Sequence, residues 1–263
     1  MVFERHSGGV RLTSAGSDVV RTAQRLLEDV ETMISTARSI GRGEGGRLKI
    51  GFYTSLSASK LRTTLLTYTQ HFPQVEVTTV EGSRARLLDG IRSGGIDVAI
   101  VTGEAKEHEG PTLALWSERI IVALPENHAL AHNNVAYWTD LKGASFVLSQ
   151  RDPGPDLRDI LAAKLSAPGD PPRIASQDVS SENILCILGA GHDISLYCES
   201  SLGIIYPGVT YREVRDALGS SYIGYKACWN SDNNNPALVR LLDLLRADHA
   251  PLATSRTGRP GEH

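Results

Sequence analysis

Hydroxyl groups that follow the expected strands are the side chains best placed to bind a small molecule. Thr54 and Ser55 come after the first core strand, Ser83 after the second and Thr102 after the third. In open parallel α/β sheets, ligands bind at the carboxyl ends of strands, beside the starts of helices. Free backbone N–H groups and the helix dipole favour an anion there. This pattern predicts a binding site for a small anion.

A second group of polar side chains lies further along the chain. Ser149, Gln150 and Arg151 follow another expected strand, and Ser181 stands at a helix start. A guanidinium group can bind a carboxylate through two hydrogen bonds. Each hydroxyl alone could equally be a helix cap, which any α/β protein needs. As a set that converges on one cleft, they favour ligand binding.

Alternating strand and helix signals must position these residues. Strands are expected near 48–52, 75–80, 97–101, 118–124, 145–148, 173–179, 193–197 and 222–228, and helices near 55–71, 84–93, 156–165, 181–189 and 236–245. A strand–helix–strand order favours a parallel α/β sheet. Residues 1–12 predict a hairpin, because Ser7-Gly8-Gly9 is a turn signal between two apolar-containing segments.

The clearest helix spans residues 13–40 and carries a heptad stripe. Thr13 or Ser14 can cap its start, and the glycines of 41–46 end it. Its apolar positions alternate in steps of three and four, which is typical of a helix that packs along another helix. The stripe predicted to form a dimer consists of Val19, Ala23, Leu26, Val30, Met33, Ala37 and Ile40.

The composition excludes several classes of protein. The chain has 263 residues, with 41% hydrophobic residues, 22% charged residues and a net charge of -3. These values are ordinary for a globular protein, whereas a dedicated nucleic-acid binder is usually basic. No apolar run is long enough to cross a bilayer, and no secretory signal is visible. Three cysteines suit a reducing compartment, so we expect a cytoplasmic protein without membrane contact.

Five short motifs, in order and at characteristic spacing, resemble those of LysR-type transcriptional regulators. An aromatic-x-Arg motif precedes a Leu-Thr-x-Ala-Gly motif, three later segments agree in order, and a fourth resembles the family's Gly-x-Gly-Ile-x-Leu turn. The segments are Phe3–His6 with Leu12–Gly16, Leu48–Phe52, Gly94–Ile100, Leu124–Leu130 and Gly189–Leu196. Ala129 stands where the family often has proline. The resemblance covers residues 2 to about 246.

The resemblance implies an α/β fold with a two-lobed effector domain like a type II periplasmic binding protein, preceded by a long linker helix. The expected parts are a wing remnant (1–12), a linker and dimerisation helix (13–41), a hinge (42–47), lobe I (48–120 and 222–250), lobe II (121–221) and a disordered tail (251–263). Hydroxyl residues at the strand ends often bind a carboxylate effector in this family.

The resemblance also implies DNA binding through three helices that normally precede the wing. Such a module needs roughly 40 more residues, so we expect a truncated chain or a start codon assigned too late. Arg5, His6 and Arg11 of the wing could contact phosphates, which positions a protein without reading sequence. DNA binding is therefore expected only through the missing helices of a complete chain.

The leading hypothesis is a regulator, not an enzyme, that senses a small carboxylate or aromatic effector between its lobes as a homodimer or homotetramer. No cofactor or metal is expected. A solute-binding protein would also have two lobes, but it does not explain the heptad helix. A truncated partner that pairs with full-length chains is a further alternative. The sequence does not give the effector, the operator or the sign of regulation.

Three other patterns favour no function of their own. The glycines of 41–46 match a dinucleotide fingerprint but follow a helix and precede a strand, the reverse of what that site needs. His128 and His132 lie in an expected loop without other metal ligands. Cys186 and Cys198 could form a redox switch, but Cys186 is expected on an apolar helix face, and buried cysteines are usually packing groups.

Overall fold

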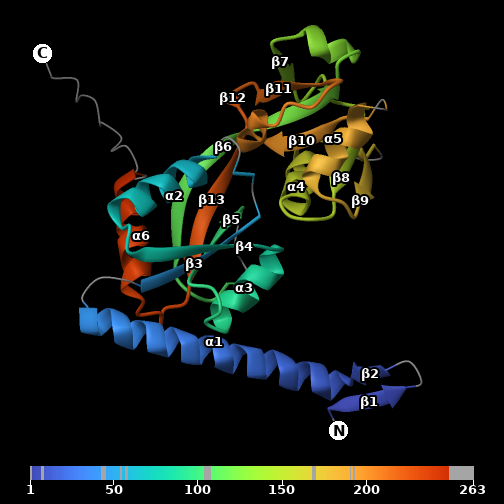
Figure 1. The fold of residues 1–263 in the computed structure, drawn as a ribbon. Coiled ribbons are helices and arrows are strands. Elements are labelled where there is room, and N and C mark those ends of the chain that lie inside the picture. The colour runs from blue at the N-terminus through green and yellow to red at the C-terminus, as the bar shows by residue number, and fades with distance from the viewer. Residues whose placement is uncertain are drawn as a thin grey trace, which may run out of the picture.

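A computed structural model of the chain describes residues 2–6, 9–42, 46–53, 55–56, 59–103, 108–167, 170–189, 191 and 193–248. They form a hairpin, a long helix and two α/β lobes (Figure 1). The hairpin pairs β1 (Phe3–His6) with β2 (Gly9–Leu12) in antiparallel register. Helix α1 (Ser14–Arg42) follows directly and runs beneath the first lobe.

The junction between the hairpin and α1 explains the Leu-Thr-x-Ala-Gly motif. Thr13 caps the helix, because its Oγ1 accepts from the Gly16 backbone N–H at 2.8 Å. The Thr13 backbone N–H donates to the Val2 carbonyl at 3.1 Å. A side chain at Gly16 would place its Cβ only 1.9 Å from that carbonyl oxygen. Glycine therefore lets the hairpin pack on the first turn of α1.

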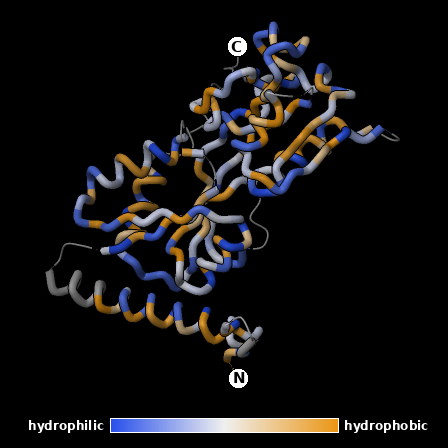
Figure 2. Tube along the Cα trace, turned by 45° about the vertical axis from the view of Figure 1, so that its right-hand side comes forward, coloured by the Kyte–Doolittle hydropathy of each residue, from blue (hydrophilic) through white to orange (hydrophobic). Residues whose placement is uncertain are grey.

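The described part of the α1 heptad stripe, from Val19 to Met33, is not covered by the lobes of its own chain. Val19, Leu26, Val30 and Met33 expose between 47% and 63% of their surface, and Ala23 is exposed as well. The side chains of Ala37 and Ile40 lie outside the described residues. Apolar residues recur along the helix (Figure 2). Such an uncovered stripe is an unfavourable exposure of apolar surface in an isolated chain.

Lobe I is built on three parallel strands in the order β5-β3-β4. The strands are β3 (Gly46–Phe52), β4 (Val75–Glu81) and β5 (Val98–Thr102), and the helices are α2 (Lys60–His71), α3 (Arg84–Arg92) and α6 (Pro236–Asp248). Strand β13 (Tyr222–Trp229) lies antiparallel to β5. The buried Tyr68 hydroxyl donates to the Ala237 carbonyl at 2.8 Å and so ties α2 to α6.

Strand β6 (Thr112–Pro125) passes through both lobes. It pairs with β13 as far as Arg119, and from Ile120 onward it pairs with β10 (Ser195–Cys198). The chain therefore has one continuous mixed sheet, in the order β12-β11-β6-β13-β5-β3-β4, with β10 also paired to β6. The largest apolar cluster follows β6 from one lobe into the other.

Lobe II surrounds the second half of β6. Its strands are β7 (Val135–Tyr137), β8 (Ser145–Ser149), β9 (Arg173–Gln177), β10, β11 (Val209–Asp216) and β12 (Gly219–Ser220). Its helices are α4 (Gly154–Leu165), α5 (Ser181–Gly189) and the short 3-10 helices η1 (Ala129–His132) and η2 (Glu199–Gly203). Strands β8 and β9 pair in parallel.

The structure corrects several expectations about the elements. The sheet is mixed, because β6 and β13 run antiparallel to their neighbours. Strand β6 begins six residues earlier than expected, and β7, β11 and β12 were not predicted. Helix α2 begins at Lys60 rather than at 55, because Ser59 caps it by accepting from the Arg62 N–H at 3.2 Å. The expected tail, 251–263, lies outside the described residues.

Candidate functional site

A cleft of about 930 Å³ lies between the two lobes. Its walls come from the end of β3, the loop after β4, the loop after β8, the start of α5, and β10 with η2. Both lobes therefore contribute to one cavity, whose volume is typical of a site for a small molecule.

Five of the residues predicted from the sequence line this cleft. Lobe I contributes Ser55 and Ser83, and lobe II contributes Gln150, Arg151 and Ser181. Thr54 lies outside the described residues. Arg151 exposes 61% of its side chain and forms an ion pair with Asp178 at 3.2 Å. Its guanidinium group is thus at the rim, and effector binding by these five residues stays a prediction.

Thr102 and Ser149 are not among the residues that line the cleft, and effector binding by them stays a prediction. The buried Ser149 hydroxyl donates to the Val179 carbonyl at 2.6 Å and accepts from the Arg151 backbone N–H at 2.9 Å. The buried Thr102 hydroxyl donates to Asp156. Hydroxyl groups with internal partners of this kind organise loops.

Two helix starts supply the electropositive part of the cleft. Ser83 caps α3, with its Oγ accepting from the Arg86 N–H at 3.4 Å. Ser180 precedes α5 and accepts from the Asn183 N–H at 3.3 Å. The remaining free N–H groups of a first helical turn favour a negative charge. An anion in the cleft could therefore interact with a helix start from either lobe.

Apolar side chains form much of the remaining wall. Phe52 and Leu56 come from lobe I, and Leu157, Leu196 and Ile204 come from lobe II. Tyr197 also lines the cleft, and its hydroxyl donates to the Ser181 carbonyl at 2.6 Å. The cleft thus combines apolar surface with a few polar groups, the composition expected for a ligand with a hydrophobic body and a charged end.

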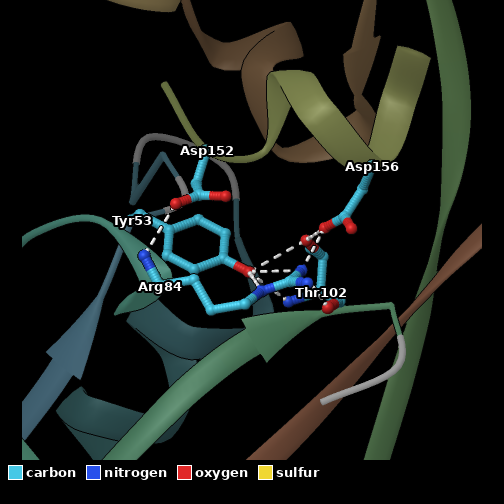
Figure 3. Close-up of polar contacts among 5 residues, drawn as sticks. All are labelled: Tyr53, Arg84, Thr102, Asp152 and Asp156. Atoms are coloured by element: carbon cyan, nitrogen blue, oxygen red, sulfur yellow. Dashed lines mark hydrogen bonds and ion pairs between the residues drawn. The ribbon is translucent and has the colours of Figure 1, made fainter. Parts of the chain in front are cut away.

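Beside the cleft, the two lobes are joined by a polar network (Figure 3). The Arg84 guanidinium group of α3 binds the Asp156 carboxylate of α4. It also donates to the Thr102 carbonyl at 2.6 Å and to the Tyr53 hydroxyl at 3.2 Å. The Arg84 backbone N–H donates to Asp152 Oδ2 at 2.7 Å. Asp152 and Asp156 of lobe II therefore both contact Arg84, the first residue of α3 in lobe I.

Burial controls the ionisation of this network. It raises the pKa of Tyr53 to about 12, so the phenol stays protonated and acts as a neutral hydrogen-bond partner. Burial also raises the pKa of Asp156, whereas the Thr102 hydroxyl and Arg84 favour its ionised form and oppose the shift. Asp156 therefore loses contact with water and gains hydrogen bonds to Thr102 and Arg84 in its place.

Sequence reasoning missed Tyr53, Arg84, Asp152 and Asp156. Three of them directly follow or precede residues that were selected, since Tyr53 precedes Thr54, Arg84 follows Ser83 and Asp152 follows Arg151. A charged residue at a helix start was therefore the available signal. Its partner in the other lobe had no signal, because that contact depends on how the lobes are placed.

The histidines and cysteines weighed as metal or redox sites have other places in the described part of the chain. Within the described residues, no group of three metal-ligating side chains is close enough to hold an ion. His128 instead caps η1 by accepting from the Leu130 N–H at 3.2 Å. Cys198 is buried in the cleft wall, and burial raises its thiol pKa to about 12. Cys186 is exposed, which corrects its expected place on an apolar face of α5.

The hairpin β1–β2 carries the residues expected to contact phosphates. Glu4 lies opposite Arg11 in the antiparallel register of the hairpin. The side chains of Arg5 and His6 lie outside those described. Phosphate contacts by these residues stay a prediction. Across the described residues, no helix combines the length and the apolar character that a membrane span requires.

Comparison with known proteins assigns the chain to a family. The family described as LysR substrate binding domain matches residues 41–250. The HTH-type transcriptional regulator TfdS of Cupriavidus pinatubonensis is 27% identical over 248 residues, which are 94% of this chain and 83% of that protein. XapR of Escherichia coli K12 is 26% identical over 246 residues, 93% of this chain and 82% of that protein.

Solved structures share the fold. CbnR, a LysR family transcriptional regulator, superposes with a TM-score of 0.78 at 20% identity, over 91% of this chain and 82% of that chain. Full-length CbnR in complex with its target DNA gives a TM-score of 0.77 at 19% identity, over 90% and 82% of the two chains. Full-length BenM gives 0.66 at 22% identity, over 95% and 82%. The two-lobed, periplasmic-binding-protein-like architecture is confirmed.

Proposed function

The chain belongs to the LysR-type transcriptional regulators, a family of non-enzymatic regulators with an effector-binding domain, and on this premise we propose that a small carboxylate or aromatic effector binds between its lobes and controls its action on DNA. The observation that carries the proposal is the cleft of about 930 Å³, which both lobes line and which two helix starts face.

The cleft favours an effector with a negative charge at one end. The carboxylate would bind at a helix start, with Ser55, Ser83, Gln150, Arg151 and Ser181 as hydrogen-bond donors. The apolar body would pack against walls that include Phe52, Leu56, Leu157, Leu196 and Ile204. A ring fits this arrangement because the polar groups and the apolar walls belong to the same cavity.

The proposed mechanism is a shift between lobe arrangements. The lobes are joined by β6 and β13, and an effector that binds one arrangement better than another shifts the equilibrium toward it. Arg47, at the end of the hinge and within β3, links α1 to lobe I: its Nη1 lies 3.8 Å from Glu31 Oε2 of the helix, and its Nε lies 3.4 Å from Glu76 Oε2 of β4. A change in lobe I can therefore alter the orientation of α1.

We further propose that two copies pair along the stripe of α1, as a cytoplasmic homodimer or as half of a homotetramer. Apolar side chains exposed in heptad spacing are satisfied by a second helix with the same stripe. This proposal assigns a role to four parts of the chain: the linker helix (13–41), the hinge (42–47), lobe I (48–120 and 222–250) and lobe II (121–221). CbnR is a relative whose complex with target DNA has been solved.

Calorimetric titration with benzoate tests the cleft, because benzoate joins one carboxylate to one aromatic ring. We expect binding to the native chain and weaker binding to Ser83→Ala and Arg151→Ala, which remove one group from each lobe. Thr69→Ala, a hydroxyl removed from the outer surface of α2, is the matched control. If both cleft variants bind as tightly as the control, the effector site assigned to this cleft is wrong.

A further inference from the structure

Asp152 places a carboxylate where the cleft is expected to receive the carboxylate of an effector. We propose that Asp152 is an internal anionic ligand of α3, which holds one side of the cleft closed together with Asp156 and is displaced when an anionic effector binds at that helix start. The internal ligand follows from the contacts between the lobes alone. The displacement step rests on the proposed function.

The contact made by Asp152 is the one an external anion would make. Its Oδ2 accepts from the Arg84 backbone N–H at 2.7 Å, and Arg84 is the first residue of α3. This N–H is among those that a helix cannot satisfy internally, and the helix dipole adds a favourable potential for negative charge. Both Asp152 and the capping residue Ser83 line the cleft. An external carboxylate and Asp152 therefore compete for one donor.

Asp156, in the first turn of α4, adds a second bond between the lobes. Its carboxylate binds the Arg84 guanidinium group and accepts from the Thr102 hydroxyl. The side chains of Arg84 and Asp156 are each only 15% exposed, so solvent and salt screen their attraction little. This weakly screened attraction is lost if the lobes separate.

Lobe I is shaped to receive the Asp156 carboxylate. Gly103 follows β5 with a φ of +66°, a left-handed conformation that favours glycine. A Cβ at this position would lie 3.1 Å from Asp156 Oδ1. Glycine thus permits the turn and the close approach of α4 at once.

The two aspartates differ from Arg151, another charged residue that lines the cleft. Arg151 pairs with Asp178 within lobe II, and both side chains are more than half exposed. That pair does not change when the lobes move. Asp152, two residues before α4, and Asp156 of α4 instead reach from lobe II to α3 in lobe I, so their bonds report on the arrangement of the lobes.

Distance measurement between spin labels tests the internal ligand without any effector. Labels at Leu66→Cys in lobe I and Leu218→Cys in lobe II, in a Cys186→Ser background and diluted with unlabelled chain, give the separation of the lobes within one molecule. We expect a longer mean distance and a broader distribution in Asp152→Asn/Asp156→Asn. Asp159→Asn removes an exposed charge from the same helix and is the matched control. A distribution unchanged from the control would overturn the internal ligand.

Titration with benzoate tests the displacement step on the same variants. We expect Asp152→Asn to bind benzoate on the order of tenfold more tightly than the native chain, because one charge-assisted bond no longer has to be broken. Benzoate should also shift the native distance distribution toward that of the double variant. Equal affinity of the native chain and Asp152→Asn would overturn displacement. Opening of the double variant with no benzoate binding by any variant would contradict the effector class and displacement, and would leave the internal ligand supported.

Discussion

Arg119 of β6 donates to Glu213 of β11 at 2.6 Å, at the position where β6 leaves lobe I and enters lobe II. Arg119 also binds Glu199 of η2, and Glu213 accepts from Arg215 at 2.7 Å. The Glu213 side chain is only 11% exposed. This cluster therefore fixes the crossing strand to lobe II, and the contact is less screened than an ordinary surface pair.

Replacing Glu213 by glutamine should destabilise the fold by about 1–3 kcal/mol, because two arginines lose the charge of their shared partner. Urea unfolding of both proteins measures the difference. Asp243→Asn is the matched control, since Asp243 pairs with Arg246 within one turn of α6 and both side chains are more than half exposed. A Glu213 variant as stable as the control would show that the cluster contributes little.

The stabilising effect of Glu213 should depend on pH in an acidic window. Hydrogen bonds, first of all from Arg215, lower the pKa of Glu213 to about 2, whereas an unfolded glutamate titrates near about 4.3. A group whose folded pKa is depressed stabilises the protein above the unfolded pKa. The difference in unfolding free energy between the native chain and Glu213→Gln should be constant at neutral pH and shrink below about pH 4.3. A difference that instead grows on acidification would contradict the assignment.

The sequence predicted those parts of the site that depend on local structure. Ser83 is a helix cap beside a strand end, and its place in the cleft follows from the order of strand and helix alone. Thr102 was predicted to face the cleft by the same reasoning, but its hydroxyl is taken up by Asp156. The partner of a strand-end hydroxyl depends on the opposite lobe, which strand and helix order does not place.

For the fold, too, the sequence predicted the elements that depend on local patterns and missed those that depend on tertiary partners. The parallel strands of lobe I follow from repeated strand–helix units, in which neighbours in sequence are neighbours in space. Strand β11 was missed because Arg212, Glu213 and Arg215 interrupt any apolar alternation along it. Those charged residues are held by tertiary partners, among them Arg119, that no local pattern reveals.

The contact between the hairpin and α1 predicts that Gly16→Ala loosens their junction, the opposite of what helix propensity alone predicts. On helix propensity alone, alanine should stabilise a helix by about 0.5–1 kcal/mol. Here its Cβ would meet the Val2 carbonyl oxygen, so the hairpin must move away. We expect faster hydrogen exchange of the Thr13 backbone N–H, which donates to that carbonyl. Ser17→Ala, an exposed change in the same turn, is the control, and equal exchange rates in the two variants would refute the steric argument.

The three thiols should differ sharply in reactivity at neutral pH. Cys198 and Cys228 are buried, and burial raises their pKa values to about 12 and about 11, whereas Cys186 is exposed. Because the thiolate is the reactive form, a disulfide reagent should modify one thiol quickly in the native chain. Cys186→Ser should have no fast thiol, and unfolding in urea should make the remaining two reactive. Fast modification of two thiols in Cys186→Ser would contradict the burial of Cys198 and Cys228.

The exposed stripe of α1 predicts that Leu26→Lys weakens self-association. Leu26 exposes 60% of its surface in the single chain, and burying a leucine contributes about 1.5–3 kcal/mol. A symmetric pair loses this contribution in both copies, and a charge is placed in the seam instead, so the dimer dissociation constant should rise by roughly a hundredfold or more. Light scattering over a dilution series measures it, with Arg25→Gln beside the stripe as the control. If Leu26→Lys associates as tightly as that control, the chain does not pair through this stripe.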